Sequence, residues 1–250
     1  MHGIRLRQLN ATYRTLSRTL GLNVLCLQET LEGHTESVGD ALGGAYMTLA
    51  HPNEGLGLVY DSAAVELREE ALIPLPKLIA MPRYAGLYMK SRHPEQKYAL
   101  ACTVTPRDGS TPFTLVNFHL DAAGTNVHRS AQLRFAVDRL RARDLTARLI
   151  ACGDANVFAL RAHGQAYKKL LAPLSELGCV DNETRPTHFF ARSREPRYAQ
   201  RILRQVGKLG LDAPRRYDVI CSNITTPARG QVETPDSDHD LLWVRLKGQA

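Results

Sequence analysis

Seven short apolar runs recur along the chain, and they limit the folds that it can adopt. The runs span residues 22–27, 56–60, 98–104, 113–120, 148–152, 217–221 and 240–246. Turn-rich segments such as 51–55 and 106–110 separate them. Runs of this length with such boundaries predict β-strands, and many of the loops between them are of hairpin length.

Two longer segments have the spacing of amphipathic helices. Apolar residues recur every three or four positions over residues 5–20, and Gly21 ends the pattern. A second segment, 127–143, has one apolar face and arginines mostly on the others. With strands outnumbering helices, we expect a mixed α/β sandwich with one core, forming one domain over residues 1–250, rather than a doubly wound sheet.

The composition excludes several classes of protein. Apolar residues make up 44% of the 250 residues and charged residues 23%, so the chain is neither disordered nor fibrous. It has no apolar run long enough for a membrane helix and no apolar leader, which makes a cytoplasmic protein the expectation. Five scattered cysteines, without a Cys-x-x-Cys pair, are interpreted as reduced core residues. The net charge of +7 favours polyanionic partners.

Polar residues stand at the ends of four of the predicted strands. The four sites are Gln28-Glu29, His119, Asp154 with Asn156, and Asp238-His239. Each alone has an ordinary explanation, such as a solvated turn residue or an Asx turn. Four of them in one chain are hard to explain as accidents, because strand ends hold reactive groups rigidly.

In their order along the chain, these residues resemble the endonuclease/exonuclease/phosphatase superfamily, which has the DNase I-like fold. Gln28-Glu29, His119-Leu120, Gly153-Asp154-x-Asn156 and Ser237-Asp238-His239 carry the resemblance, with Arg216-Tyr217-Asp218 and Thr187 as weaker matches. It extends over about residues 5–246. The resemblance implies a four-layer α/β sandwich, two packed mixed sheets flanked by helices, that cleaves phosphate esters with Mg²⁺, or alternatively Mn²⁺, at one edge.

The resemblance also assigns candidate metal ligands. Glu29 is the first candidate and Asp238 the second. Mg²⁺ takes oxygen ligands and keeps several waters, so one or two carboxylates with a substrate phosphate suffice.

The other strand-end residues are candidate catalytic groups. Asp154 is expected to orient or deprotonate the attacking water, and Asn156 to hold that water or a phosphoryl oxygen. His119 and His239 are expected to bind the phosphoryl oxygens as charge accumulates. The resemblance pairs His239 with Asp218. Whether His239 acts as a base or as an electrostatic stabiliser is left open.

Two arginines are candidate substrate ligands. Arg129 lies in the first turn of the second predicted helix, where its planar guanidinium would grip a phosphate, the alternative being an exposed helix residue. Arg216 directly precedes the Asp218 strand. Gln132 has a weaker claim.

A basic segment spans residues 185–216, interpreted as an insertion. It holds nine basic and two acidic residues, a net charge equal to that of the whole chain, with apolar residues at helical spacing from Tyr198 to Leu209. A nucleic-acid groove is the leading interpretation, with Phe189, Phe190 or Tyr198 stacking on bases. An anionic membrane surface and a solvated insertion without function are the alternatives.

The beginning of the sequence departs from the family pattern. Relatives carry Asn-x-His-Gly at the end of a first strand, whereas here only Met1-His2-Gly3 is present. We therefore expect a central strand and its Asn to be missing, as in a truncated gene model, which would leave two neighbouring strand edges open. The codons upstream of Met1 would test this.

The sequence thus predicts a Mg²⁺-dependent phosphodiesterase, foremost a nuclease acting on DNA or RNA. One alternative is a phosphatase or phosphodiesterase acting on lipid or sugar phosphates. The other is a relative that binds nucleic acid with impaired catalysis.

Overall fold

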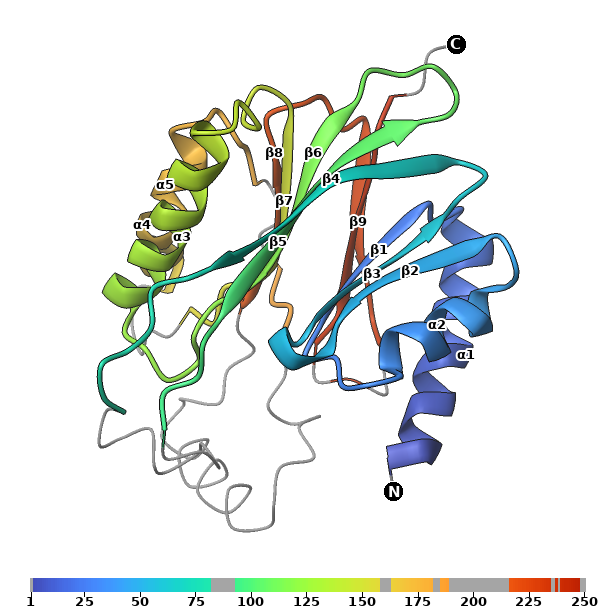
Figure 1. The fold of residues 1–250 in the computed structure, drawn as a ribbon, viewed down its shortest axis with the longest axis horizontal. Helices are drawn as coiled ribbons and strands as arrows, with labels where there is room; N and C mark the ends of the chain where they lie inside the picture. Colours follow the sequence, from blue (N-terminus) through green and yellow to red (C-terminus); the bar gives the residue numbers. More distant parts are fainter. Residues whose placement is uncertain are drawn as a thin grey trace.

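Two β layers lie face to face, with helices on both outer sides (Figure 1). The computed structural model describes residues 2–81, 93–157, 163–181, 185–188, 216–234, 237 and 239–247. The predicted four-layer sandwich is confirmed. None of the described helices is long and apolar enough to cross a lipid bilayer.

Runs of consecutive strands along the chain are separated by helices. The strands are β1 (Val24–Gln28), β2 (Tyr46–His51), β3 (Leu56–Asp61), β4 (Val65–Pro74), β5 (Tyr98–Pro106), β6 (Phe113–His119), β7 (Leu149–Asp154), β8 (Asp218–Ser222), β9 (Ala228–Val232) and β10 (Leu241–Arg245). The helices are α1 (His2–Leu20), α2 (His34–Leu42), the 3₁₀ turn η1 (Pro52–Glu54), α3 (Asn126–Arg141), α4 (His163–Leu170) and α5 (Ala172–Ser175).

One layer is a continuous five-stranded sheet in the order β4-β5-β6-β7-β8. The β6–β7 pair is parallel and the other pairs are antiparallel. Every residue of β6 and β7 is buried, because apolar layers cover both faces of these strands. The complete sheet is therefore the rigid centre of the molecule.

The other layer is in two pieces, β1-β3-β2 and β10-β9. Among the described residues, β1 is paired only with β3, and β10 only with β9. Residues of β9 and β10 are half-buried or exposed, unlike those of β6 and β7. Within the described residues, this layer is therefore divided between β1 and β10.

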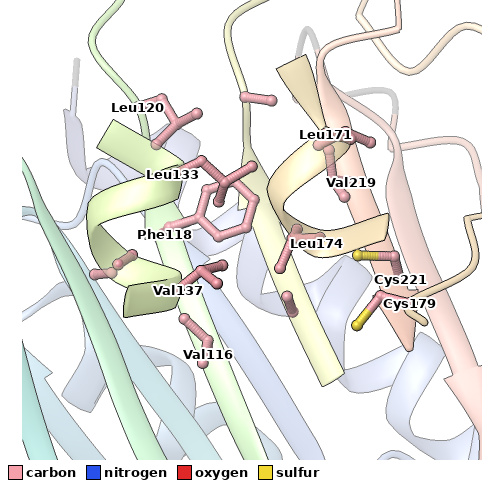
Figure 2. Packing of buried hydrophobic residues seen from close by; sticks show 14 of the residues in the cluster. Val116, Phe118, Leu120, Leu133, Val137, Leu171, Leu174, Cys179, Val219 and Cys221 are labelled. Atoms are coloured by element: carbon pink, nitrogen blue, oxygen red, sulfur yellow. The ribbon is translucent and has the colours of Figure 1, made fainter. Parts of the chain in front are cut away.

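The helices α3, α4 and α5 form where they do because their apolar residues pack on the outer face of the complete sheet. Leu133 and Val137 of α3 pack on Phe118, while Leu171 and Leu174 lie over Val219, as Figure 2 shows. Phe118 is 1% exposed, so the contact with α3 is dry. The apolar face predicted for this helix is the one that it buries.

The predicted strands and both predicted helices are present, whereas β2, β4 and β9 were not predicted. In β4, five consecutive residues from Glu66 to Glu70 are half-buried or exposed, so its sequence lacks an apolar run. All five cysteines are free, and four of them are buried. Most of the basic segment, residues 189–215, lies outside the described residues, as do its predicted helix and seven of its nine basic side chains.

Candidate active site

At one edge of the complete sheet, β6 and β7 end and β8 begins. The register places His119 at the end of β6 opposite Asp154 of β7, and Asp154 opposite Asp218 of β8. The strand-end positions of the sequence thus become neighbours across the sheet. His119 and Asp154 are buried, and Asp218 is partly buried.

Asp218 binds His239, which reaches this edge from the other layer. Nδ1 of His239 lies 2.8 Å from Oδ2 of Asp218, so the pairing implied by the family resemblance is present. The hydroxyl of Thr187 accepts hydrogen bonds from the backbone N–H groups of Tyr217 and Asp218, each at 3.0 Å. The start of β8 is therefore fixed, and with it the carboxylate that orients the imidazole.

Glu29 closes the site from the end of β1. Its Oε1 lies 3.8 Å from Nε2 of His119, and Oδ2 of Asp154 lies 3.9 Å from the same nitrogen. The backbone of Glu29 has a φ of 55°, a left-handed conformation that is uncommon for a residue with a side chain. Its side chain is 80% exposed and therefore accessible to a ligand.

Burial shifts the protonation of the central groups. Desolvation raises the pKa of the Asp154 carboxyl to about 7; the nearby His239 opposes this rise, whereas Asp218 and Glu29 add to it. Desolvation lowers the pKa of His119 to about 3, with Lys97 and His239 contributing further. The imidazole of His119 is thus neutral at pH 7 and donates a hydrogen bond from only one of its nitrogens.

The donor atoms at this edge fit a hard divalent cation. One donor atom each of Asp154, Asp218 and His239 lies within 4.8 Å of the others. The raised pKa of the buried Asp154 carboxyl indicates that nearby positive charge only partly compensates its ionised form. A bound divalent cation would supply that compensation. Carboxylates suit Mg²⁺ better than imidazole does, so the exposed carboxylate of Glu29 is a better candidate ligand than the His239 ring.

Tight backbone packing shapes the turn after β7. A Cβ atom on Gly153 would lie 1.8 Å from the carbonyl oxygen of Phe118, so only glycine fits there. Asn156, with a φ of 48°, donates its backbone N–H to Asp154 at 2.7 Å and its side-chain N–H to the carbonyl of Leu120 at 2.9 Å. Both bonds hold the predicted amide beside the predicted water-activating carboxylate.

The alternative that Arg129 is an exposed helix residue is wrong, because Arg129 is only 2% exposed. Its guanidinium donates to the carbonyls of Asp121 and Ala122 and to the side chain of Asn126, each at 2.8 Å. Gln132 accepts from the Asp121 N–H in the same loop. Arg129 therefore orders the loop after β6, and phosphate binding by this residue stays a prediction.

Arg216 also has protein partners. It forms an ion pair with Asp181 and lies over the ring of Tyr167, 4.4 Å from the ring centre. The Tyr167 hydroxyl donates to Asp181 at 2.6 Å. Substrate binding by Arg216 stays a prediction, and Asp238, the second predicted metal ligand, lies outside the described residues.

Two residues near the site were missed by the sequence analysis. Asn117, fully buried, donates to the carbonyls of Leu27 and Gly57 and accepts from Gln28, which ties β6 to the strand that ends in Glu29. The His188 ring stacks on Tyr217 and meets the edge of His239, with ring centres 4.6 Å apart in both cases. Asn117 could have been recognised from the sequence, because it is a polar residue inside the apolar run 113–120. The sequence around His188 contains no comparable indication.

Solved structures share the overall fold of this chain. An endonuclease/exonuclease/phosphatase from Bacteroides vulgatus aligns with a TM-score of 0.65 at 16% identity, over 97% of this chain and 91% of the other. The chain has the endonuclease/exonuclease/phosphatase fold. The same fold occurs in a mannosyl-6-phosphatase from Bacteroides thetaiotaomicron (TM-score 0.62, 12% identity, 96% and 91% covered). It also occurs in D. rerio TDP2, solved with a single-stranded DNA product (0.62, 16%, 94% and 90%).

No protein-family model matches the sequence, and no curated protein sequence matches it either. The endonuclease/exonuclease/phosphatase fold is therefore visible in the three-dimensional arrangement while the overall sequence has diverged. Among the residues that carried the resemblance, His119, Asp154 and Asp218 lie at the edge where the carboxyl ends of β6 and β7 meet the amino end of β8.

Proposed function

We propose that this protein hydrolyses phosphoric esters with the help of a divalent cation. The observation that carries the proposal is the convergence of Asp154, the Asp218–His239 pair, His119 and Glu29 at one sheet edge, on the fold of known phosphoesterases. Glu29 would hold the cation, beside the Asp154 carboxyl. When bound, Mg²⁺ neutralises the phosphate and lowers the pKa of bound water.

The residues of the chain divide the remaining chemistry among them. Asp154, with a pKa near neutrality, orients the attacking water and accepts its proton. The neutral imidazole of His119 donates to a phosphoryl oxygen. His239, oriented through Nδ1 by Asp218, presents Nε2 to another phosphoryl oxygen and stabilises the charge that develops there.

Nucleic acid is the proposed substrate class. The basic segment 185–216 carries a net charge of +7 and directly precedes β8, which begins at Asp218. Clustered arginines bind phosphates independently of base sequence. Sugar phosphates are the second candidate, because the similarly folded mannosyl-6-phosphatase bears such a substrate in its name.

Hydrolysis assays test both the reaction and the substrate class. Cleavage of single- and double-stranded DNA, of RNA and of a sugar monophosphate is followed with and without Mg²⁺ for the native chain, Asp154→Ala and Asp138→Ala. We expect Asp154→Ala to lose about 10²–10⁴-fold of the activity and the exposed control Asp138→Ala to lose none. Equal cleavage by the native chain and Asp154→Ala would disprove the assignment.

Salt dependence separates the substrate classes. Affinity for a nucleic-acid substrate should fall steeply as the salt concentration rises, whereas turnover of a small sugar phosphate should change little. Salt-sensitive binding of nucleic acid without turnover of any substrate would instead support a binding protein. In that case Glu29→Gln would leave the binding unchanged.

A further inference from the structure

The short segment 185–188 contacts both β layers at the edge that carries the candidate active site. The hydroxyl of Thr187 accepts the N–H groups at the start of β8, and its carbonyl accepts the N–H of Asp240 at 2.8 Å, one residue before β10. The next residue, His188, forms an isolated antiparallel bridge with His239. The segment therefore connects the complete sheet to the divided layer.

The carbonyl of Pro186 adds a further connection. It accepts a hydrogen bond from the side-chain nitrogen of Gln231 in β9 at 2.6 Å, and the same nitrogen donates to Oδ2 of Asp240 at 2.7 Å. The three residues from Pro186 to His188 are thus bound to residues that precede and follow His239. The place of the His188 side chain is set by this backbone frame.

Three aromatic rings meet in this region. The His188 ring stacks on Tyr217 with an interplanar angle of 18° and meets the edge of His239 at 70°. Stacked and edge-on pairs are the preferred arrangements of such rings. The rings of Tyr217 and His239 are 6.4 Å apart at their centres, so His188 is the ring in close contact with both. His188 is 6% exposed and Tyr217 8%, so their neighbours hold both rings in place.

A single hydrogen bond leaves the orientation of the His239 imidazole incompletely fixed. The bond from Nδ1 to Asp218 fixes one ring nitrogen, yet the ring can still turn about that bond. The side chain of His239 is 30% exposed, so packing restrains it from only part of its surroundings. The edge-on contact with His188 opposes the turning of the ring. A reactive group is held in a productive geometry only when packing and hydrogen bonds act together in this way.

We propose that His188 is a positioning residue that holds the ring plane of His239 and thereby the direction of its Nε2. With 6% of its surface exposed, His188 has almost no area left for contact with a substrate, so its effect passes through His239. The consequence for hydrolysis rests on the proposed function, in which Nε2 of His239 binds a phosphoryl oxygen. The restraint of the ring does not depend on that function.

Two substitutions of His188 separate this restraint from the general stability of the region. His188→Ala removes the ring, whereas His188→Phe keeps a flat ring that can stack on Tyr217 and meet the edge of His239. Phe135→Ala is the control, because it removes a partly buried ring from the core between α3 and the complete sheet.

NMR of the ¹⁵N-labelled histidines, without divalent cation or substrate, measures the restraint directly. The proton on Nδ1 of His239 is assigned with His239→Gln, and its exchange with water is followed. We expect exchange to be about tenfold faster or more in His188→Ala than in the native chain, because the bond to Asp218 opens more often, and close to native in His188→Phe and Phe135→Ala. Equal exchange in His188→Ala and the native chain would overturn the proposal.

Steady-state hydrolysis measures the consequence for the reaction. With Mg²⁺ and the best-cleaved substrate of the hydrolysis assays, His188→Ala should lower kcat about tenfold or more and leave KM within about twofold, because His239 acts on charge that develops in the transition state. His188→Phe should recover most of kcat. An equal loss of kcat in Phe135→Ala would contradict a specific role of His188. If the native chain cleaves no substrate, the proposed function fails, whereas the exchange of the Nδ1 proton still decides the role of His188.

Discussion

The two β layers contribute to the site in different ways. The complete sheet fixes His119, Asp154 and Asp218 on three adjacent strands whose registers are set by continuous pairing. The divided layer supplies Glu29 from one piece, while His239 lies two residues before β10 of the other. The fixed part of the site therefore rests on the complete sheet, while the distance between Glu29 and His239 depends on what lies between the two pieces.

The largest expected effect is at the centre of the complete sheet. Gly153→Ala would place a Cβ against the Phe118 carbonyl, where neither backbone has room to move. We expect a loss of about 4 kcal/mol or more in unfolding free energy, or failure to fold. Soluble yield and denaturant unfolding measure this. Gly164→Ala in α4, where nothing lies within 4 Å, is the control, and equal stability of both variants would contradict the prediction.

Truncation of one side chain in each layer compares how tightly the two layers are packed. Phe118→Ala removes a ring that is 1% exposed, and we expect it to cost about 3–5 kcal/mol. Val244→Ala in the divided layer removes a half-buried side chain beside the cavity, and about 1 kcal/mol or less is expected, because the site is already partly open. Similar losses in urea unfolding would show that the two layers are equally well packed.

The pH dependence of stability tests how strongly burial disfavours the ionised form of Asp154. Its pKa is about 7 in the folded chain and near 4 when unfolded, so between these values the folded state binds more protons. Stability is therefore lost as the pH rises from about 4 to about 7. Asp154→Asn removes the titrating group, and its Tm should exceed that of the native chain by about 4 °C or more at pH 8, with little difference at pH 4.

Thermal unfolding across that pH range, without divalent cations, measures the effect. Asp138→Asn on the exposed face of α3 serves as the control and should follow the native curve. A Tm difference between Asp154→Asn and the native chain that does not change with pH would refute the role of protonation.

A smaller effect is expected at the start of β8. Thr187→Val leaves the N–H groups of Tyr217 and Asp218 without their hydroxyl acceptor, at a cost of about 1–3 kcal/mol. Thr187→Ser keeps the hydroxyl and should recover most of this loss. Calorimetric unfolding of both variants checks it, and equal destabilisation by Thr187→Val and Thr187→Ser would contradict the prediction.

The sequence was most informative where burial on both faces imposes a continuous apolar run. For this reason β6 and β7 were predicted, together with the polar residues at their ends. In contrast, β9 lies in the divided layer and has Arg229, Gly230 and Gln231 at its centre, so its sequence contains no apolar run. The direction of pKa shifts and the burial of Arg129 depend on packing between distant segments, which spacing along one chain does not reveal.

The Asn117 amide has a mechanical consequence. It is fully buried and holds carbonyl groups of both β1 and β3 from the opposite sheet. Sliding of one layer over the other by a single residue would break these bonds inside an apolar interior. Shear between the layers is thus resisted two residues from His119, next to the edge that carries the candidate active site.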